Sequence, residues 1–193
     1  MERPPTGGRF GLRGPTCGFD HVGGPSYDSA TVKIEVVRSP RRRKTITAEH
    51  REGRVVVRLP AGLSLAEERQ WVDRMVTRLT ERERAERLNA RRGLQATAER
   101  LNEEHFGGRL RWDWIRFVAN QRDRFGSCTP EDGSIRISHR VAEYPAWVRE
   151  YVVMHELAHL EVPSHSPRFW RLVDRYPLAE RARGFLIAKG WED

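Results

Sequence analysis

The feature that most constrains the fold is a cluster of histidines near residue 155. The segment MHELAHLEVPSHSPRFW, residues 154–170, holds His155, His159 and His165 within eleven positions. His155 and His159 are four apart, so on a helix they lie about 6 Å apart along the axis and nearly on one face. Both imidazoles can then reach one ion at about 2.0–2.1 Å. The spacing therefore predicts a helix that carries a metal site.

Glu156 stands directly after the first histidine. On a helix it is turned about 100° from that histidine, which suits contact with a metal-bound water better than contact with the metal. In the arrangement H-E-x-x-H this glutamate serves as the general base of a metal-assisted hydrolysis. The motif therefore predicts Glu156 as the catalytic residue.

His165 is the predicted third ligand. Its gap from His159 matches that of the longer motif H-E-x-x-H-x-x-G-x-x-H, in which the helix ends at glycine and the chain turns back to the metal. Here Val162 occupies the glycine position and Pro163 supplies the break, which is a departure from that motif. Three histidines leave a fourth position open for water, the pattern of a catalytic zinc site. The predicted cofactor is Zn²⁺, held by His155, His159 and His165.

Two other interpretations of the cluster stay open from the sequence. The histidines can lie on a helix without any metal, or the site can be a closed structural zinc site with Cys128 as the fourth ligand. Of the other histidines, His105 is expected at a helix C-terminus, where it suits the helix dipole. His139 ends a predicted strand just before the site, where it is a candidate for substrate contact.

The segments before the cluster predict strands and then helices. Residues 32–37, 45–50 and 54–60 are rich in β-branched side chains, and a short turn separates the last two, which is typical of a strand followed by a hairpin. Ser64 and Glu67 form a capping-box pattern ahead of a long, charged helix. That helix is expected to be interrupted at a glycine, Gly93, and to resume after it.

The second half predicts strands and helices once more. Residues 109–120 are predicted as a strand with a bulge after Trp114, where the alternation slips. A second hairpin is expected round the turn at residues 130–133, and the histidine helix is expected from residue 146 to about 162. The order of strands, helices, strands and helices predicts an α+β fold.

The first 30 residues predict a disordered tail, because they are rich in glycine and proline and lack a hydrophobic period. No run approaches the roughly 18 apolar residues of a membrane span, and the N-terminus lacks the hydrophobic segment of a secretion signal. Cys17 and Cys128 are the only cysteines, which fits a reducing compartment. The expected location is the cytoplasm, without membrane association.

The excess of positive over negative charge is confined to the first half of the chain. Residues 1–100 carry 21 Lys and Arg against 13 Asp and Glu, whereas residues 101–193 carry 14 against 14. This excess makes nucleic acid a candidate partner of the basic N-terminal half, bound through its phosphates. The alternative is a solvated surface in a chain that favours arginine, since only three of its 35 basic residues are lysines.

These motifs resemble the YgjP-like family of zinc metallopeptidases, relatives of the SprT/Spartan zincins. The resemblance runs from about Thr31 to Trp191 and rests on the run Arg124 to Cys128, on the HELAH core, and on His165-Ser166 followed by Phe169-Trp170. The family usually has tryptophan where this chain has Phe125.

The resemblance implies an N-terminal β-rich lobe followed by a zincin-like catalytic lobe with an HExxH helix. With the tail, the expected organisation is a disordered segment at 1–30, the β-rich lobe at 31–63 and a zincin-like metallopeptidase domain at 64–193. The resemblance also implies the same three histidines as zinc ligands and Glu156 as the base.

The function predicted from these features is that of a zinc-dependent metallopeptidase, a hydrolase that acts on a protein or peptide substrate. Two alternatives stay open: a zinc-dependent hydrolase of nucleotide phosphoanhydrides, and a nucleic-acid-binding module with a structural zinc. The sequence does not rank the candidates for stabilising the oxyanion, which are His139, Arg140, Tyr144, Tyr151 and Tyr176.

Overall fold

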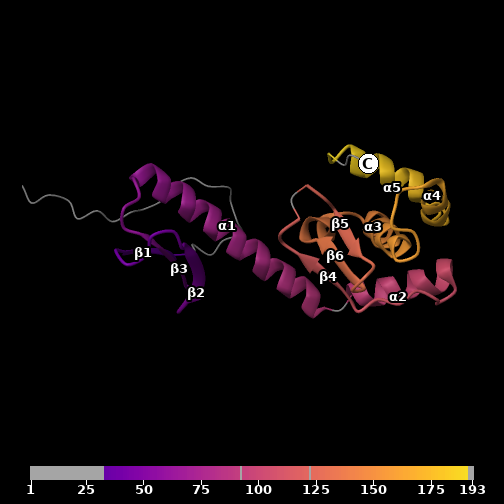
Figure 1. Ribbon diagram of the computed structural model, residues 1–193, viewed down its shortest axis with the longest axis horizontal. Helices are drawn as coiled ribbons and strands as arrows, with labels where there is room; N and C mark the ends of the chain where they lie inside the picture. Colours follow the sequence, from indigo (N-terminus) through magenta and orange to yellow (C-terminus); the bar gives the residue numbers. More distant parts are fainter. Residues whose placement is uncertain (1–32, 92, 122, 191–193) are drawn as a thin grey trace, which may run out of the picture. The chain divides into compact units, whose positions relative to one another are not determined.

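The structure is a computed structural model that describes residues 33–91, 93–121 and 123–190 (Figure 1). The tail predicted for residues 1–30 lies outside these described residues. Within them, three strands are followed by two helices, three further strands and then the helices of the C-terminal part. The predicted α+β class is thus confirmed.

The first sheet is built from β1 (Lys33–Ser39), β2 (Thr47–Arg51) and β3 (Arg54–Pro60), in the order β1-β3-β2. β2 and β3 form the predicted hairpin, and the turn between them places Glu52 and Gly53 at positive φ, 49° and 75°. β1 pairs with β3 in parallel. The predicted strand and hairpin are therefore confirmed, and β3 is the central strand.

Helix α1 (Leu65–Ala90) packs against this sheet. The capping box forms as predicted, because the backbone N–H of Glu67 donates to Ser64 Oγ (3.3 Å) and the backbone N–H of Ser64 donates to Glu67 Oε2 (2.9 Å). Val72 and Leu79 lie in a small core with the inward side chains of β3, whereas Ala85, further along the helix, belongs to a larger core. One helix therefore contributes to two hydrophobic cores. Helix α2 (Gly93–Phe106) follows it after the break predicted at Gly93.

The second sheet consists of β4 (Trp114–Val118), β5 (Gly126–Thr129) and β6 (Ser134–Ser138), in the order β4-β6-β5. β4 runs parallel to β6, and β5 runs antiparallel to it. The predicted hairpin round residues 130–133 is confirmed. β5 lies at one edge of the sheet, next to the helix that carries the histidines.

The strand predicted for residues 109–120 is shorter than expected, and the predicted bulge is wrong. Regular pairing begins only at Trp114, and from there the burial alternates without a slip. The preceding residues are held by a helix side chain: Asn102 Nδ2 donates to the Leu110 carbonyl oxygen (3.2 Å), and the Leu110 N–H donates to Asn102 Oδ1 (3.1 Å). Because this amide satisfies the backbone of Leu110, that stretch does not need a neighbouring strand.

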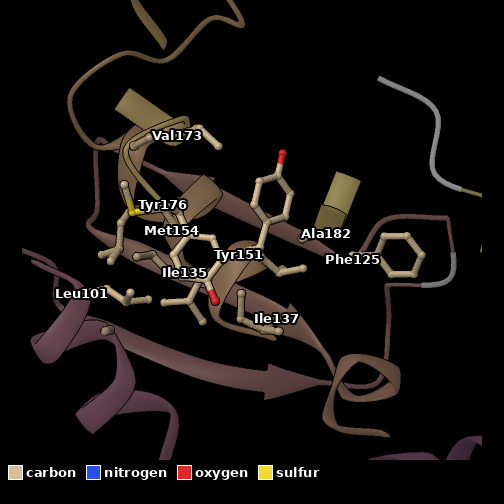
Figure 2. Packing of buried hydrophobic residues seen from close by; sticks show 14 of the residues in the cluster. Leu101, Phe125, Ile135, Ile137, Tyr151, Met154, Val173, Tyr176 and Ala182 are labelled. Carbon is tan, nitrogen blue, oxygen red and sulfur yellow. The ribbon is translucent and has the colours of Figure 1, made fainter. Parts of the chain in front are cut away.

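The C-terminal part contains a 3₁₀ turn at His139–Glu143 and the helices α3 (Ala146–His159), α4 (Pro167–Val173) and α5 (Ala179–Ile187). α3 lies beside β5 and β6 and carries the histidine motif, as predicted (Figure 1). Its apolar side chains pack in the larger core, where Met154 and Tyr151 of α3 belong to the same buried cluster as Ile135 and Ile137 of β6 (Figure 2). The motif is therefore anchored on the larger core.

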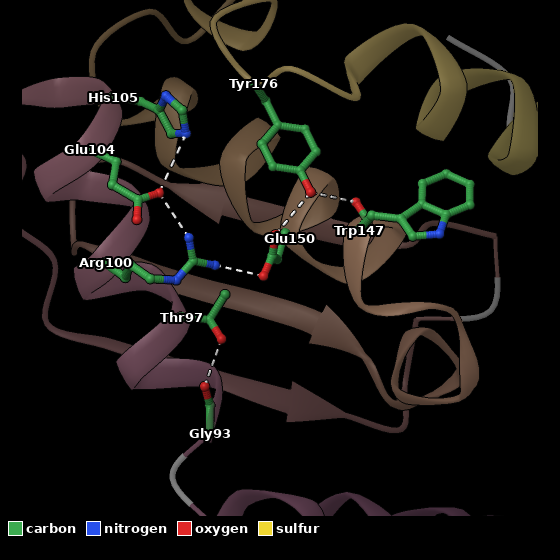
Figure 3. A network of polar contacts seen from close by, with 8 residues as sticks. All are labelled: Gly93, Thr97, Arg100, Glu104, His105, Trp147, Glu150 and Tyr176. Carbon is green, nitrogen blue, oxygen red and sulfur yellow. Dashed lines mark hydrogen bonds and ion pairs between the residues drawn. The ribbon is translucent and has the colours of Figure 1, made fainter.

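A polar network fastens α3 to its neighbours (Figure 3). The Tyr176 hydroxyl lies 2.9 Å from Glu150 Oε2 and 3.1 Å from the Trp147 carbonyl oxygen. Arg100 of α2 donates to Glu150 (2.6 Å) and to Glu104 (2.8 Å). The network links α2, α3 and the segment before α5 one turn away from the histidine motif. No helix among the described residues is both long and apolar enough to cross a membrane.

Candidate metal centre

The three predicted ligands meet at one point. His155 and His159 project from α3, and His165 reaches them from the segment between α3 and α4. His165 Nε2 lies 3.1 Å from His155 Nε2 and 3.1 Å from His159 Nε2, and the ligand atoms of the group all lie within 4.8 Å of one another. Two nitrogens bound tetrahedrally to one zinc ion are about 3.3 Å apart. The donor set and its spacing therefore fit a single zinc ion.

The turn that brings His165 back to α3 also orients His159. The backbone N–H of Val162 donates to the Ala158 carbonyl oxygen (2.9 Å), which extends the last turn of the helix up to Pro163. The carbonyl oxygen of Val162 then lies 3.3 Å from His159 Nδ1. A hydrogen bond at Nδ1 leaves Nε2 to face a metal, which is the usual arrangement of a histidine ligand.

Aromatic side chains of α4 enclose the imidazoles. The ring of Phe169 is fully buried and stacks on His159, with centroids 4.4 Å apart. It also contacts the edge of the His155 ring at 4.8 Å, while Trp170 stacks on His165 at 5.4 Å. Phe169 and Trp170 thus restrain the planes of the three rings.

The surroundings keep the histidines of α3 neutral. Burial lowers the pKa of His155 well below its ordinary value, and the neighbouring His159, His165 and Arg183 lower it further. Burial also lowers the pKa of His159, although the hydrogen bond to Val162 opposes this. Only a neutral imidazole has a lone pair to offer to a cation. His155 and His159 are therefore in the ligand-competent protonation state at neutral pH.

Glu156 lies beside the histidines and is almost completely buried, with 4% of its surface exposed. Burial raises the pKa of its carboxyl to about 8, and the positive charge of Arg124 opposes that shift. Its Oε2 atom is buried and accepts no hydrogen bond from any residue in the described ranges. A carboxyl with a pKa near neutrality can take up and release a proton at working pH, and a cation bound nearby would lower this pKa.

The histidines and Glu156 line one wall of a cavity of about 380 Å³. The facing wall is formed by the residues 123–128, which include the edge strand β5, and by Pro130. Apolar side chains of α3 and α5, Val152 and Leu186, complete it. The cavity therefore brings the motif of α3 and the edge of the second sheet to the same space.

The other candidates from the sequence are distributed differently. Cys128 lines the cavity but is not part of the group of potential metal ligands, and burial raises the pKa of its thiol to about 12. His105 lies elsewhere, against Tyr176 and Glu104. His139 is buried in the 3₁₀ turn, with Nδ1 3.4 Å from the Val118 carbonyl oxygen, and does not line this cavity.

Of the five oxyanion candidates, Tyr151 is the one that lines the cavity. It stands one turn before His155 on α3, and the two rings lie 6.3 Å apart. Two further residues of the cavity were not assigned roles from the sequence. Arg124 supplies positive charge near Glu156, and Gly126 lies against the Glu156 side chain. Their run, Arg124 to Cys128, supported the family resemblance, but spacing along the chain does not place it against α3.

A helix bearing H-E-x-x-H, a third histidine returned by a turn, and the edge of a sheet across a shared cavity are together typical of metallopeptidases. Comparison with known families points to one family. Residues 94–184 match the model of the YgjP-like metallopeptidase domain, and the resemblance seen in the sequence is confirmed.

No curated protein matches the chain. Among solved structures, the chain is similar to the metallopeptidase zymogen of Pyrococcus abyssi abylysin, with 21% sequence identity and a TM-score of 0.44. That similarity covers 50% of this chain and 93% of the other.

Proposed function

We propose that the chain is a zinc-dependent peptidase in which His155, His159 and His165 hold the ion and Glu156 is the general base. The observation that carries this proposal is the convergence of three Nε2 atoms beside a buried carboxyl in one cavity. When bound, zinc would supply Lewis acidity and a water whose pKa is lowered to about 7.

The residues of the chain would perform the remaining steps. Glu156, whose side chain lies buried beside the histidines in the cavity, accepts the proton of the attacking water and passes it to the leaving amine. Tyr151 and Arg124 are the groups of the cavity that can stabilise negative charge on the carbonyl oxygen. Val152 and Leu186 give the cavity an apolar surface against which a side chain of the substrate can lie.

The proposed substrate is a protein or peptide, in keeping with the metallopeptidase domain. A closed structural zinc site is less well supported, because Cys128 stands apart from the histidine group and its raised pKa disfavours the thiolate that binds metal. Within this proposal, residues 31–63 are a β-rich lobe, residues 64–193 are the catalytic domain, and the protein acts in the cytoplasm.

The test is the variant Glu156→Gln, which keeps the size of the side chain but cannot accept a proton. We expect it to fold, to bind one zinc ion per chain, and to lose at least about a hundredfold in the rate of hydrolysis of unfolded casein. Glu161→Gln is the matched control, because Glu161 follows the same helix but forms ion pairs with Arg109 and Arg168 outside the cavity. Its rate should equal that of the parent. Undiminished hydrolysis by Glu156→Gln would remove this residue from the mechanism.

A further inference from the structure

The side chain of Glu156 lies directly against the backbone of β5 at Gly126. A Cβ atom at position 126 would stand 2.8 Å from both Cγ and Cδ of Glu156, and closer still to its Oε1. These three atoms are the nearest neighbours that such a Cβ would meet. Carbon atoms that are not bonded prefer separations of about 3.5–4.0 Å. No residue other than glycine therefore fits at position 126 while Glu156 keeps its place.

The need for glycine here is steric and does not come from the backbone conformation. Gly126 is not among the residues at positive φ, so other amino acids could adopt its backbone angles. The strand also has little freedom to withdraw. Gly126 pairs with Ile137 of β6, and the neighbouring Phe125 carbonyl oxygen accepts a hydrogen bond from the Ser138 N–H (2.8 Å). A larger residue would therefore displace the side chain of Glu156 instead of the strand.

Displacement of the carboxylate tip alone would not relieve the overlap. The contact includes Cγ, so the side chain would have to rotate about its Cα–Cβ bond. Glu156 is buried on its other sides, and the open direction is the cavity that it shares with the histidines. Rotation in that direction would carry the carboxylate away from β5 and into the space where the substrate is expected.

We propose that Gly126 is a positioning residue. Because it has no side chain, β5 packs directly against Glu156, and this packing sets the direction in which the carboxylate faces. The catalytic part of this inference rests on the proposed function, because it assigns importance to the place of the general base. The steric part stands on the packing of Gly126 against Glu156 alone.

The experiment is a double-mutant cycle of the full-length chain with Gly126→Ala, Glu156→Ala and the pair. Gly126→Ala should lower the melting temperature by roughly 2–10 °C, the range expected for an overpacked contact in a domain of this size. In the Glu156→Ala background all three neighbouring atoms are gone, so Gly126→Ala should leave the melting temperature unchanged or raise it slightly. Gly184→Ala is the control, since a Cβ at that exposed position of α5 meets nothing within 4 Å.

Two further measurements separate positioning from general damage. The zinc content of Gly126→Ala should equal that of the parent, because the clash involves none of the histidines, and a crystal structure should show the Glu156 carboxylate turned from β5 into the cavity. Hydrolysis of casein should fall by at least tenfold in kcat when Gly126 is replaced in the parent, and not fall further when it is replaced in Glu156→Ala.

The outcomes distinguish the two proposals. An equal change of melting temperature in both backgrounds, or a carboxylate that keeps its place in Gly126→Ala, would overturn the role of Gly126. If the effects of the two substitutions on the melting temperature are coupled but Glu156→Ala keeps full activity, the contact between the two residues stands and the proposed function is overturned.

Discussion

The rings of His159 and Phe169 lie nearly parallel, with centroids 4.4 Å apart and an interplanar angle of 27°. Phe169 belongs to α4 and is fully buried, so its position is fixed by the larger core. The core thereby restrains the plane of the His159 imidazole, while the Val162 carbonyl oxygen restrains its rotation within that plane. The two contacts prepare the ring for metal binding before any ion arrives.

Replacing this aromatic support should therefore weaken the metal site. We expect Phe169→Leu to fold but to bind zinc about 10–100-fold more weakly, the usual loss when a residue that orients a ligand is changed. Competition with a chromophoric chelator measures the affinity. Phe185→Leu is the control, because Phe185 packs against Tyr144 and Trp147 instead of the histidines. Equal zinc affinity in the two variants would show that stacking on His159 does not support the site.

The assignment of His165 as the third ligand leads to a second prediction. Its Nε2 atom lies 3.1 Å from each of the other two, so His165→Ala would leave the ion with two protein ligands. We expect this variant to lose most of its bound zinc, as measured by elemental analysis of the purified protein. His105→Ala, which alters a histidine next to Tyr176, should keep one zinc per chain. Full occupancy in purified His165→Ala would exclude His165 from the ligand set.

The convergence of the three histidines could be predicted from sequence because it depends on short-range geometry. His155 and His159 share a helix face through their spacing of four, and the turn at Pro163 returns His165 within six residues. The strand hairpins and the capping box at Ser64 are local in the same sense, and the structure contains them. Features that depend on neighbours close in the chain were therefore predicted well.

Contacts between distant segments could not be predicted in this way. The two hydrogen bonds between the Asn102 side chain and the backbone of Leu110 shorten β4. Nothing in the alternation of apolar and polar residues over 109–120 indicates them. The approach of Gly126 to Glu156 joins positions 30 residues apart, and it depends on the order β4-β6-β5, which places β5 at the edge next to α3. A single sequence contains patterns that predict helices and strands. It contains none that predicts which residue of a strand lies against which residue of a helix.

The network round Tyr176 gives a prediction about stability. The hydroxyl of this buried tyrosine donates to the charged Glu150 at 2.9 Å, and Tyr176→Phe removes that bond without changing the packing of the ring. We expect the free energy of unfolding to fall by about 1–2 kcal/mol in urea titrations. Arg82→Ala breaks only an exposed ion pair with Glu86 and should change the free energy of unfolding by less than about 0.5 kcal/mol. A loss no greater for Tyr176→Phe than for this control would contradict the prediction.

The Tyr176 hydroxyl should also make the difference in stability between the parent and Tyr176→Phe depend on pH. Burial raises the pKa of Tyr176, and the hydrogen bond to Glu150 raises it further. Because the folded pKa lies above the unfolded value of about 10, the contribution of the neutral hydroxyl is present in full below about pH 10 and is lost as the pH rises through the folded pKa. The gap in stability between the parent and Tyr176→Phe should thus be constant from pH 6 to 9 and narrow above about pH 10.

The basic N-terminal half yields the last prediction, which concerns nucleic acid. The run Arg41 to Lys44 lies in the connection between β1 and β2, where Arg41, Arg43 and Lys44 are exposed. Arg42 is instead held by the Thr45 carbonyl oxygen and Thr47 Oγ1, at 3.4 and 3.3 Å. The three exposed cations are free to approach phosphates, so we expect the chain to bind duplex DNA with an affinity that falls steeply as salt is added.

Replacing Arg41, Arg43 and Lys44 by glutamine should flatten the plot of log affinity against log salt by about 2–3 units, since each phosphate contact contributes a slope of about 0.9. Fluorescence anisotropy with a labelled duplex at several salt concentrations measures this slope. The control replaces the exposed cations Arg171, Arg181 and Lys189 of the C-terminal part, where positive and negative charges balance, and its slope should equal that of the parent. An absence of binding at low salt would mean that the basic run is solvated surface, and equal slopes in all three proteins would place the contacts elsewhere.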